Sequence, residues 1–100
     1  MPGTITIPTD AIRAFCTRWM IVEFAIFGSA IRDDFRPDSD VDVLVTFAPG
    51  TTRDFDDYDQ MEDELAALFG RRVDLVERRR VVNPFRLAHI LANHRVVYAA

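Results

Sequence analysis

Asp40 and Asp42 stand two residues apart at the start of an apolar run, Val41 to Phe47, that is typical of a β-strand. Because side chains alternate along a strand, both carboxylates should project from the same face. Two like charges side by side are costly unless a cation lies between them. Carboxylate oxygens with positions left for water and phosphates are ligands that Mg²⁺ accepts. Taken alone, however, an Asp-x-Asp pair is more often a solvated strand edge after a turn.

Two further features of the sequence favour the metal interpretation. Gly28-Ser29 ends a β-rich run, Val22 to Phe27, at a point where a helix can begin. Glycine lets a phosphate approach the backbone, and a helix N-terminus presents free N–H groups to an anion. Asp74 lies inside another strand-like run, Val73 to Glu77, where a carboxylate is costly unless a cation pairs with it. A phosphate cradle facing three strand carboxylates indicates metal-dependent phosphoryl transfer.

The elements that must position these residues alternate between helix and strand. In chain order, the patterns predict a helix over Thr9–Trp19, a strand over Val22–Phe27, a short helical segment over Ser29–Phe35, a turn at Arg36–Ser39, a strand over Val41–Phe47, a helix over Phe55–Phe69, a strand over Val73–Glu77 and a helix over Pro84–Asn93. This order implies an α/β fold in which helices flank a small mixed β-sheet.

The ends of the predicted helices carry recognisable signals. Thr9 or Asp10 can supply the N-cap oxygen of the first helix. Gly70 stands where a glycine commonly ends a helix, after Phe69. Asn83 is a suitable N-cap for the last helix, with Pro84 at its first position.

Several other residues are expected to be structural. Cys16 lies on the apolar face of the first helix and should be a buried, unreactive thiol. Trp19 and the phenylalanines are expected in the core, and Tyr98 is expected to pack on the sheet. His89 and His94 are five residues apart, which does not place them on one helix face, so a metal pair is not expected.

The motif residues together resemble a known superfamily. Gly28-Ser29, ten intervening residues and Asp40-Val41-Asp42 resemble the signature of the polymerase-β-like nucleotidyltransferases. The stretch from Phe27 to Val45 is similar to the minimal nucleotidyltransferase (MNT) family in particular, and Arg71 to Val76 is similar to that family's later strand with its third carboxylate. The resemblance covers essentially the whole chain. It implies a single minimal nucleotidyltransferase domain over residues 1–100.

The resemblance also implies roles for individual residues. The catalytic and Mg²⁺-binding set is Asp40, Asp42 and Asp74. The nucleotide-binding set is Gly28, Ser29 and Arg32, with Arg32 offsetting charge on the leaving group. Asp74 is also expected to accept the proton of the attacking hydroxyl. Asp33 departs from the family, in which glycine is common at this position, and would add negative charge near a phosphate.

The family resemblance implies a function as well. MNT proteins are similar to the antitoxins that accompany HEPN-domain ribonuclease toxins and transfer AMP from ATP to a toxin tyrosine. We therefore expect an Mg²⁺-dependent protein adenylyltransferase whose partner is a HEPN-domain toxin and whose substrate is ATP. A core of this size has little room for an acceptor pocket, so the acceptor hydroxyl should come from a second protein.

Three alternative functions remain open from the sequence. The chain could be an antitoxin that neutralises its toxin by binding alone, although a pure binder does not need the three carboxylates. It could modify a small molecule, although such enzymes normally carry an added substrate domain. It could bind nucleic acid through its arginine-rich segment, although the net charge of −4 argues against this. Arg78, Arg79 and Arg80 suit a solvated turn and contact with an acidic partner or triphosphate equally well.

Length and composition limit which of these functions are possible. The chain has 100 residues, 49% hydrophobic and 28% charged, which suits one folded domain with a packed core. Its one cysteine excludes an internal disulfide and a cysteine-based zinc site. No apolar stretch approaches the ~20 residues that span a bilayer, and residues 1–10 lack the pattern of a secretory signal. We therefore expect a cytoplasmic protein without membrane association.

Overall fold

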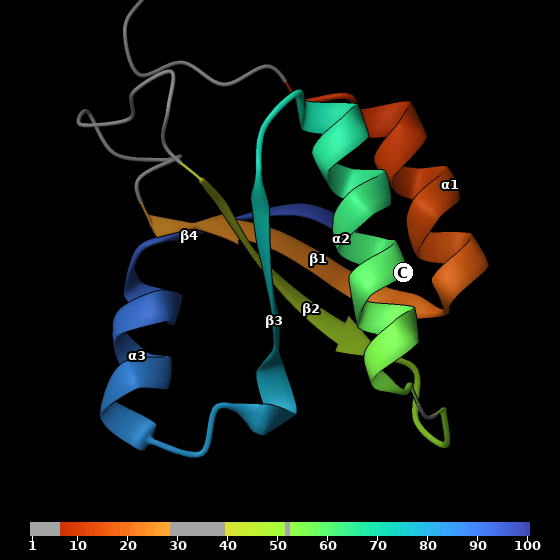
Figure 1. Cartoon of the computed structure of the whole chain (residues 1–100). Coiled ribbons are helices and arrows are strands. Elements are labelled where there is room, and N and C mark those ends of the chain that lie inside the picture. The colour runs from red at the N-terminus through yellow and green to blue at the C-terminus, as the bar shows by residue number, and fades with distance from the viewer. Residues whose placement is uncertain (1–6, 29–39, 52) are drawn as a thin grey trace, which may run out of the picture.

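The computed structural model describes residues 7–28, 40–51 and 53–100, and its centre is a four-stranded mixed sheet (Figure 1). The strands are β1 (Ile21–Phe27), β2 (Val41–Phe47), β3 (Val73–Glu77) and β4 (His94–Ala99), in the order β3-β2-β1-β4. β1 pairs antiparallel with both β2 and β4, whereas β2 and β3 are parallel. The predicted fold class, a small mixed sheet flanked by helices, is confirmed.

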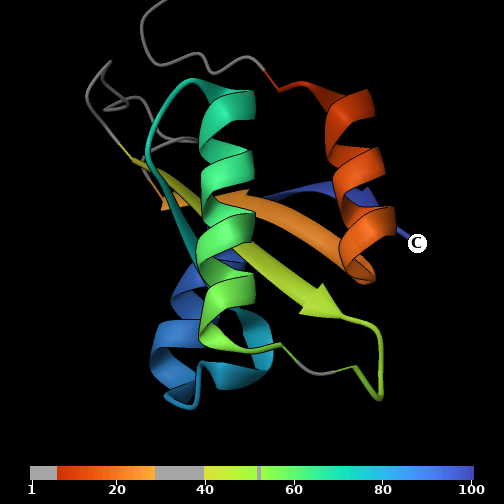
Figure 2. The same cartoon turned by 45° about the vertical axis from the view of Figure 1, so that its right-hand side comes forward.

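Helices cover both faces of this sheet. α1 (Thr9–Trp19) and α2 (Phe55–Phe69) lie side by side over one face, whereas α3 (Pro84–Ala92) lies on the other, as Figures 1 and 2 show. Alternation along β2 divides its residues between two cores: Val43 packs in the cluster under α1 and α2, and Leu44 packs in the cluster under α3. The two faces of the sheet therefore have separate environments.

The helix ends confirm most of the predicted signals. α2 begins with a capping box between Asp54 and Asp57, and Gly70 ends it in the left-handed conformation. The Asn83 side chain accepts hydrogen bonds from the backbone of α3, which starts with Pro84 and ends at Ala92, one residue earlier than predicted.

The predicted side-chain cap of α1 is wrong. Pro8 occupies the N-cap position without a side-chain hydrogen bond, and its carbonyl accepts from the backbone of Ile12 at 3.0 Å. Thr9 is already the first residue of the helix, so neither Thr9 nor Asp10 stands at the capping position. Asp10 in the first turn still suits the positive end of the helix dipole.

The sequence prediction missed β4. This strand follows α3 directly and pairs with β1, Phe27 opposite His94 and Phe24 opposite Tyr98. β4 is an edge strand, and half of its residues are exposed: Arg95, Val96 and Ala99. The alternation of apolar and polar residues that marks a strand is therefore weak. Tyr98 packs against the core, as expected.

Burial agrees with the prediction for some residues and not for others. Cys16 is fully buried, and burial raises the pKa of its thiol to about 12, so it is an unreactive core residue. Phe15 and Phe24 are buried, but Phe55 and Phe85 are 83% and 85% exposed, so the expectation that all phenylalanines are core is wrong. Phe55 and Phe85 stand in the first turns of α2 and α3, on sides of those helices that the sheet does not cover.

Some predicted elements lie outside the described residues, namely the short helix over 29–35 and the turn over 36–39. In the ranges that the structure describes, none of the helices has the length and apolar character needed to cross a bilayer.

Candidate active site at the paired carboxylates of β2 and β3

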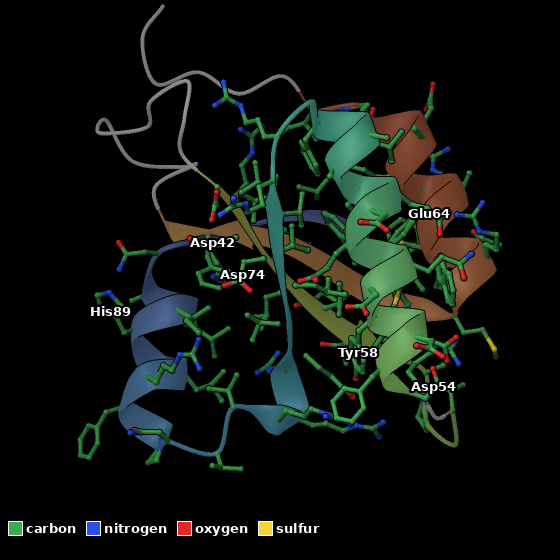
Figure 3. The ribbon with its side chains drawn as sticks, viewed as in Figure 1. Asp42, Asp54, Tyr58, Glu64, Asp74 and His89 are labelled. Carbon is green, nitrogen blue, oxygen red and sulfur yellow. The ribbon has the colours of Figure 1, made fainter. Side chains whose placement is uncertain are left out.

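Asp42 and Asp74 occupy paired positions on the adjacent parallel strands β2 and β3. Two residues further along these strands, Leu44 and Val76 pack in the cluster under α3. Because strand side chains alternate, Asp42 and Asp74 project from that same face. Figure 3 shows the two aspartates next to each other near the end of the sheet where both strands begin. The structure therefore brings together two carboxylates that are 32 residues apart in the sequence.

Gly28 lies directly against Asp42. It follows β1, whose last residue, Phe27, is the register partner of Asp42. Its φ of +74° is in the region that favours glycine, and a Cβ atom at this position would collide with Oδ2 of Asp42. The backbone at the end of β1 and the Asp42 carboxylate are thus packed without room for a side chain between them.

Asp40 lies immediately before β2 and is exposed. Within residues 7–28, 40–51 and 53–100, no three His, Cys, Asp or Glu side chains are grouped closely enough to hold a metal ion. The structure thus pairs Asp42 with Asp74 but does not bring Asp40 into a cluster with them. Ser29, Arg32 and Asp33 lie outside the described residues, so their predicted places are not tested.

The donor set at the pair suits Mg²⁺. Both side chains offer only oxygen, and Mg²⁺ is commonly held by one or two carboxylates together with water and substrate phosphates. Asp74 is exposed and Asp42 is partly buried, so a ligand can approach from the solvent side. Asp42 has further interactions within the chain. The residues present therefore fit a magnesium–nucleotide complex.

Glu62 of α2 holds the strand that carries Asp74. Its Oε2 accepts a hydrogen bond of 2.9 Å from the backbone N–H of Leu75, the residue after Asp74. β3 is an edge strand, and this bond satisfies one of the backbone donors on its open side. Glu62 was not among the site residues predicted from the sequence, although its position in the helix could have indicated it. It lies four residues after Tyr58 and three before Leu65, within the apolar stripe of the helix.

A cluster of charged residues lies at the C-terminal end of β3. Glu77 is only 4% exposed; it accepts a hydrogen bond from the Tyr58 hydroxyl and another of 2.6 Å from Nε of Arg79, and its Oε2 lies 3.1 Å from Nε of Arg80. Burial alone would raise the pKa of Glu77, but these hydrogen bonds and the two guanidinium charges outweigh it and lower the pKa. Burial and the bond to Glu77 raise the pKa of Tyr58 to about 12.

This cluster changes the interpretation of Arg78–Arg80. The three residues form a short 3₁₀-helix, η2 (Arg78–Arg80). Arg79 and Arg80 neutralise a buried carboxylate of the same chain, and Arg78 lies 4.0 Å from Glu23. The sequence suggested either a solvated turn or contact with an acidic partner or triphosphate. The pairing of Arg79 and Arg80 with Glu77 was not predicted.

Comparisons with known proteins show which family the chain resembles. Residues 9–97 match the family described as "Nucleotidyltransferase domain". The chain is 37% identical over 68 residues to MJ0128 of Methanocaldococcus jannaschii, a relative that is named as a protein adenylyltransferase. The match covers 68% of this chain and 67% of the relative. A solved minimal nucleotidyltransferase is 33% identical, with a TM-score of 0.70, over 87% of this chain and 86% of that one.

The fold also recurs in a toxin–antitoxin assembly. A tri-AMPylated HEPN toxin of Shewanella oneidensis has been solved in complex with an MNT antitoxin. The similarity has a TM-score of 0.65 and 17% identity, and covers 92% of this chain and 70% of the matched chain. At this identity the likeness concerns the fold.

Proposed function

The chain belongs to the nucleotidyltransferase domain family, and on that basis we propose that it transfers AMP from ATP to a tyrosine hydroxyl of a HEPN-domain ribonuclease toxin, as that toxin's antitoxin. The observation that carries this proposal is the pairing of Asp42 with Asp74 on adjacent strands, with Asp42 packed against Gly28. The names of similar proteins support it, since one is called a protein adenylyltransferase and another is an MNT antitoxin in complex with an AMPylated HEPN toxin.

In the proposed reaction, the tyrosine oxygen attacks the α-phosphorus of ATP. A new oxygen–phosphorus bond forms, the bond to the β-phosphate oxygen breaks, and pyrophosphate leaves. Asp42 and Asp74 are the residues that would hold Mg²⁺, which supplies neutralisation of the triphosphate charge. Asp40, immediately before β2, is proposed to join them.

Other residues would handle the proton and the phosphates. Asp74 is exposed, so its carboxylate is accessible to the attacking hydroxyl and is proposed to accept its proton. Gly28, Ser29 and Arg32 are proposed to bind the phosphate oxygens.

The exposed position of Asp74 also suits an acceptor on a second protein. A tyrosine on another chain can approach Asp74 from solvent without entering a deep pocket. Only the geometry around the attacked phosphorus needs to be fixed by this chain, because the acceptor protein positions its own tyrosine.

The test uses the purified chain and the HEPN-domain protein of the same organism, incubated with ATP and Mg²⁺. Intact-mass spectrometry should show the adenylyl mass gain on the HEPN-domain protein, and fragmentation should place it on a tyrosine. EDTA should abolish the gain. No gain with ATP and Mg²⁺, or a gain that is unchanged in EDTA, would contradict the proposal.

A further inference from the structure

A hollow of about 310 Å³ lies beside the C-terminal half of β3. Its apolar lining includes Val76 and Val81, which belong to the cluster under α3, together with the ring of Tyr58 from α2. Glu77, at the end of β3, is also in its wall. The hollow therefore lies between the first turns of α2 and α3, and not at the Asp42–Asp74 pair.

Phe55 is the most unusual residue of this hollow. It is 83% exposed although it is a large aromatic side chain, and it lines both the hollow and a smaller one of about 150 Å³ beside it. Aromatic side chains that stand next to an unfilled apolar hollow are typical of the central contacts of protein interfaces. Phe55 makes this a candidate docking surface.

The charges around the hollow indicate what kind of group it would accept. Arg80 is already engaged, since it pairs with Glu77 and lies over the Tyr58 ring at 5.2 Å. Arg86 also lines the hollow, and among the described residues no carboxylate forms an ion pair with it. Asp59 lies in the wall as well, on α2. A partner carboxylate is therefore favoured beside Arg86 on α3 and disfavoured beside α2.

The hollow is close enough to the carboxylate pair for one partner to contact both. Val76 lines the hollow and lies two residues after Asp74 on the same strand. At about 3.3 Å per residue, the two positions are roughly 7 Å apart along β3. A standard interface of about 800 Å² per partner spans much more than this distance. A protein seated in the hollow would thus have its surface within reach of Asp74.

We propose that this hollow is the docking site for the acceptor protein, which seats an apolar side chain against Phe55 and places a neighbouring carboxylate against Arg86. The inference rests on the proposed function, because it takes the acceptor to be a second protein that must reach Asp74. It adds a recognition surface that is separate from the reacting groups. Recognition and chemistry should therefore be separable by mutation.

The variants are Phe55→Ala and Arg86→Glu, each with a matched control. Phe85→Ala removes an equally exposed phenylalanine that does not line the hollow, and Arg95→Glu reverses an exposed charge on β4, at the opposite edge of the sheet. Phe55→Ala and Arg86→Glu should each raise the KM for the HEPN-domain protein about tenfold, with kcat and the KM for ATP unchanged. Both controls should leave all three constants as they are.

Binding is measured separately from transfer, by calorimetry with the HEPN-domain protein, on a background that also carries Asp42→Asn and Asp74→Asn. The Kd should rise about tenfold with Phe55→Ala and with Arg86→Glu, and not with the controls. If these changes weaken binding although the chain with intact Asp42 and Asp74 transfers no AMP, the docking site stands and the proposed transfer fails. If transfer occurs with an unchanged KM in both variants, the docking site is wrong and the transfer stands. Sedimentation in which Phe55→Ala dissociates a dimer of this chain, without affecting the HEPN-domain protein, would also overturn the docking site.

Discussion

The carboxylate of Asp42 occupies the space that a Cβ atom on Gly28 would need. Gly28 follows β1 and has a positive φ of 74°, and Asp42 lies in β2 opposite Phe27, the last residue of β1. The glycine proposed to approach the phosphates and an aspartate proposed to hold Mg²⁺ are therefore in direct contact. A substitution at Gly28 should therefore displace Asp42, the proposed metal ligand, in addition to disturbing contacts with the phosphates.

The first prediction concerns Gly28→Ala. The added Cβ must displace the Asp42 carboxylate, and alanine is also strained at a φ of +74°, by about 1–2 kcal/mol. We expect lower thermal stability and at least tenfold weaker binding of ATP with Mg²⁺, measured by calorimetry.

Gly70→Ala is the matched control for this change. Gly70 has a similar φ of +68°, but nothing lies within 4 Å of its added Cβ. It should lose only the stability that backbone strain costs, about 1–2 kcal/mol, and keep nucleotide binding. Equal loss of ATP binding in the two variants would show that backbone strain, and not crowding of Asp42, is responsible.

The second prediction concerns the paired carboxylates. Asp42→Asn and Asp74→Asn should each reduce AMP transfer at least ~100-fold, because the metal loses a charged ligand. For Asp74→Asn, the free energy of unfolding in the absence of Mg²⁺ should be unchanged or slightly higher, since the change removes one of two like charges. Asp63→Asn, at an exposed position of α2, is the control and should change neither AMP transfer nor the free energy of unfolding. Transfer that survives in the double variant would place the chemistry elsewhere.

The third prediction tests Glu62 as a positioning residue. Glu62→Ala leaves the N–H of Leu75 without its acceptor and should loosen β3 around Asp74. We expect the Mg²⁺ concentration for half-maximal transfer to rise several-fold, while the KM for the acceptor stays constant. Glu62→Gln keeps an acceptor oxygen and should restore most of the affinity for Mg²⁺. If Glu62→Ala changes stability alone, Glu62 has no influence on the site.

The fourth prediction concerns stability at low pH. The pKa of Glu77 is lowered in the folded chain, so the unfolded chain binds the proton more tightly. The stabilisation by Glu77 is present above its unfolded pKa of about 4.3 and is lost as the pH falls through its folded pKa. Glu77→Gln should cost about 2 kcal/mol at pH 7 and flatten the acid side of the stability curve. Urea unfolding between pH 7 and pH 3 measures this, and an unchanged acid dependence would contradict it.

Local periodicity was sufficient to predict most elements of this fold. The bounds of α1, α2, β2 and β3 match the predicted ranges, because each has a clear apolar period and a clear stop. β4 was missed because an edge strand is defined by its pairing with β1, which the sequence of His94–Ala99 does not reveal. The exposure of Phe55 and Phe85 was missed for a related reason, since periodicity does not show where the sheet ends.

The candidate site was predictable only in part. The spacing of Asp40 and Asp42 and the unusual place of Asp74 in a strand indicated these carboxylates as candidate site residues. Their pairing across β2 and β3, and the contact between Gly28 and Asp42, depend on the register of strands that are distant in the sequence. The Glu77 cluster likewise depends on α2 packing beside β3, which brings Tyr58 to Glu77.

The ratio of antitoxin to toxin distinguishes catalytic silencing of the partner from silencing by occlusion. A sub-stoichiometric amount of the chain is mixed with the HEPN-domain toxin, ATP and Mg²⁺, and the residual ribonuclease activity is followed over time. A covalent mark outlasts the complex, so one molecule of the chain should silence many toxin molecules, and Asp74→Asn should abolish this turnover. Inhibition that stops at one toxin per chain, and is unchanged when ATP is omitted, would show that the chain acts by occlusion and contradict the account.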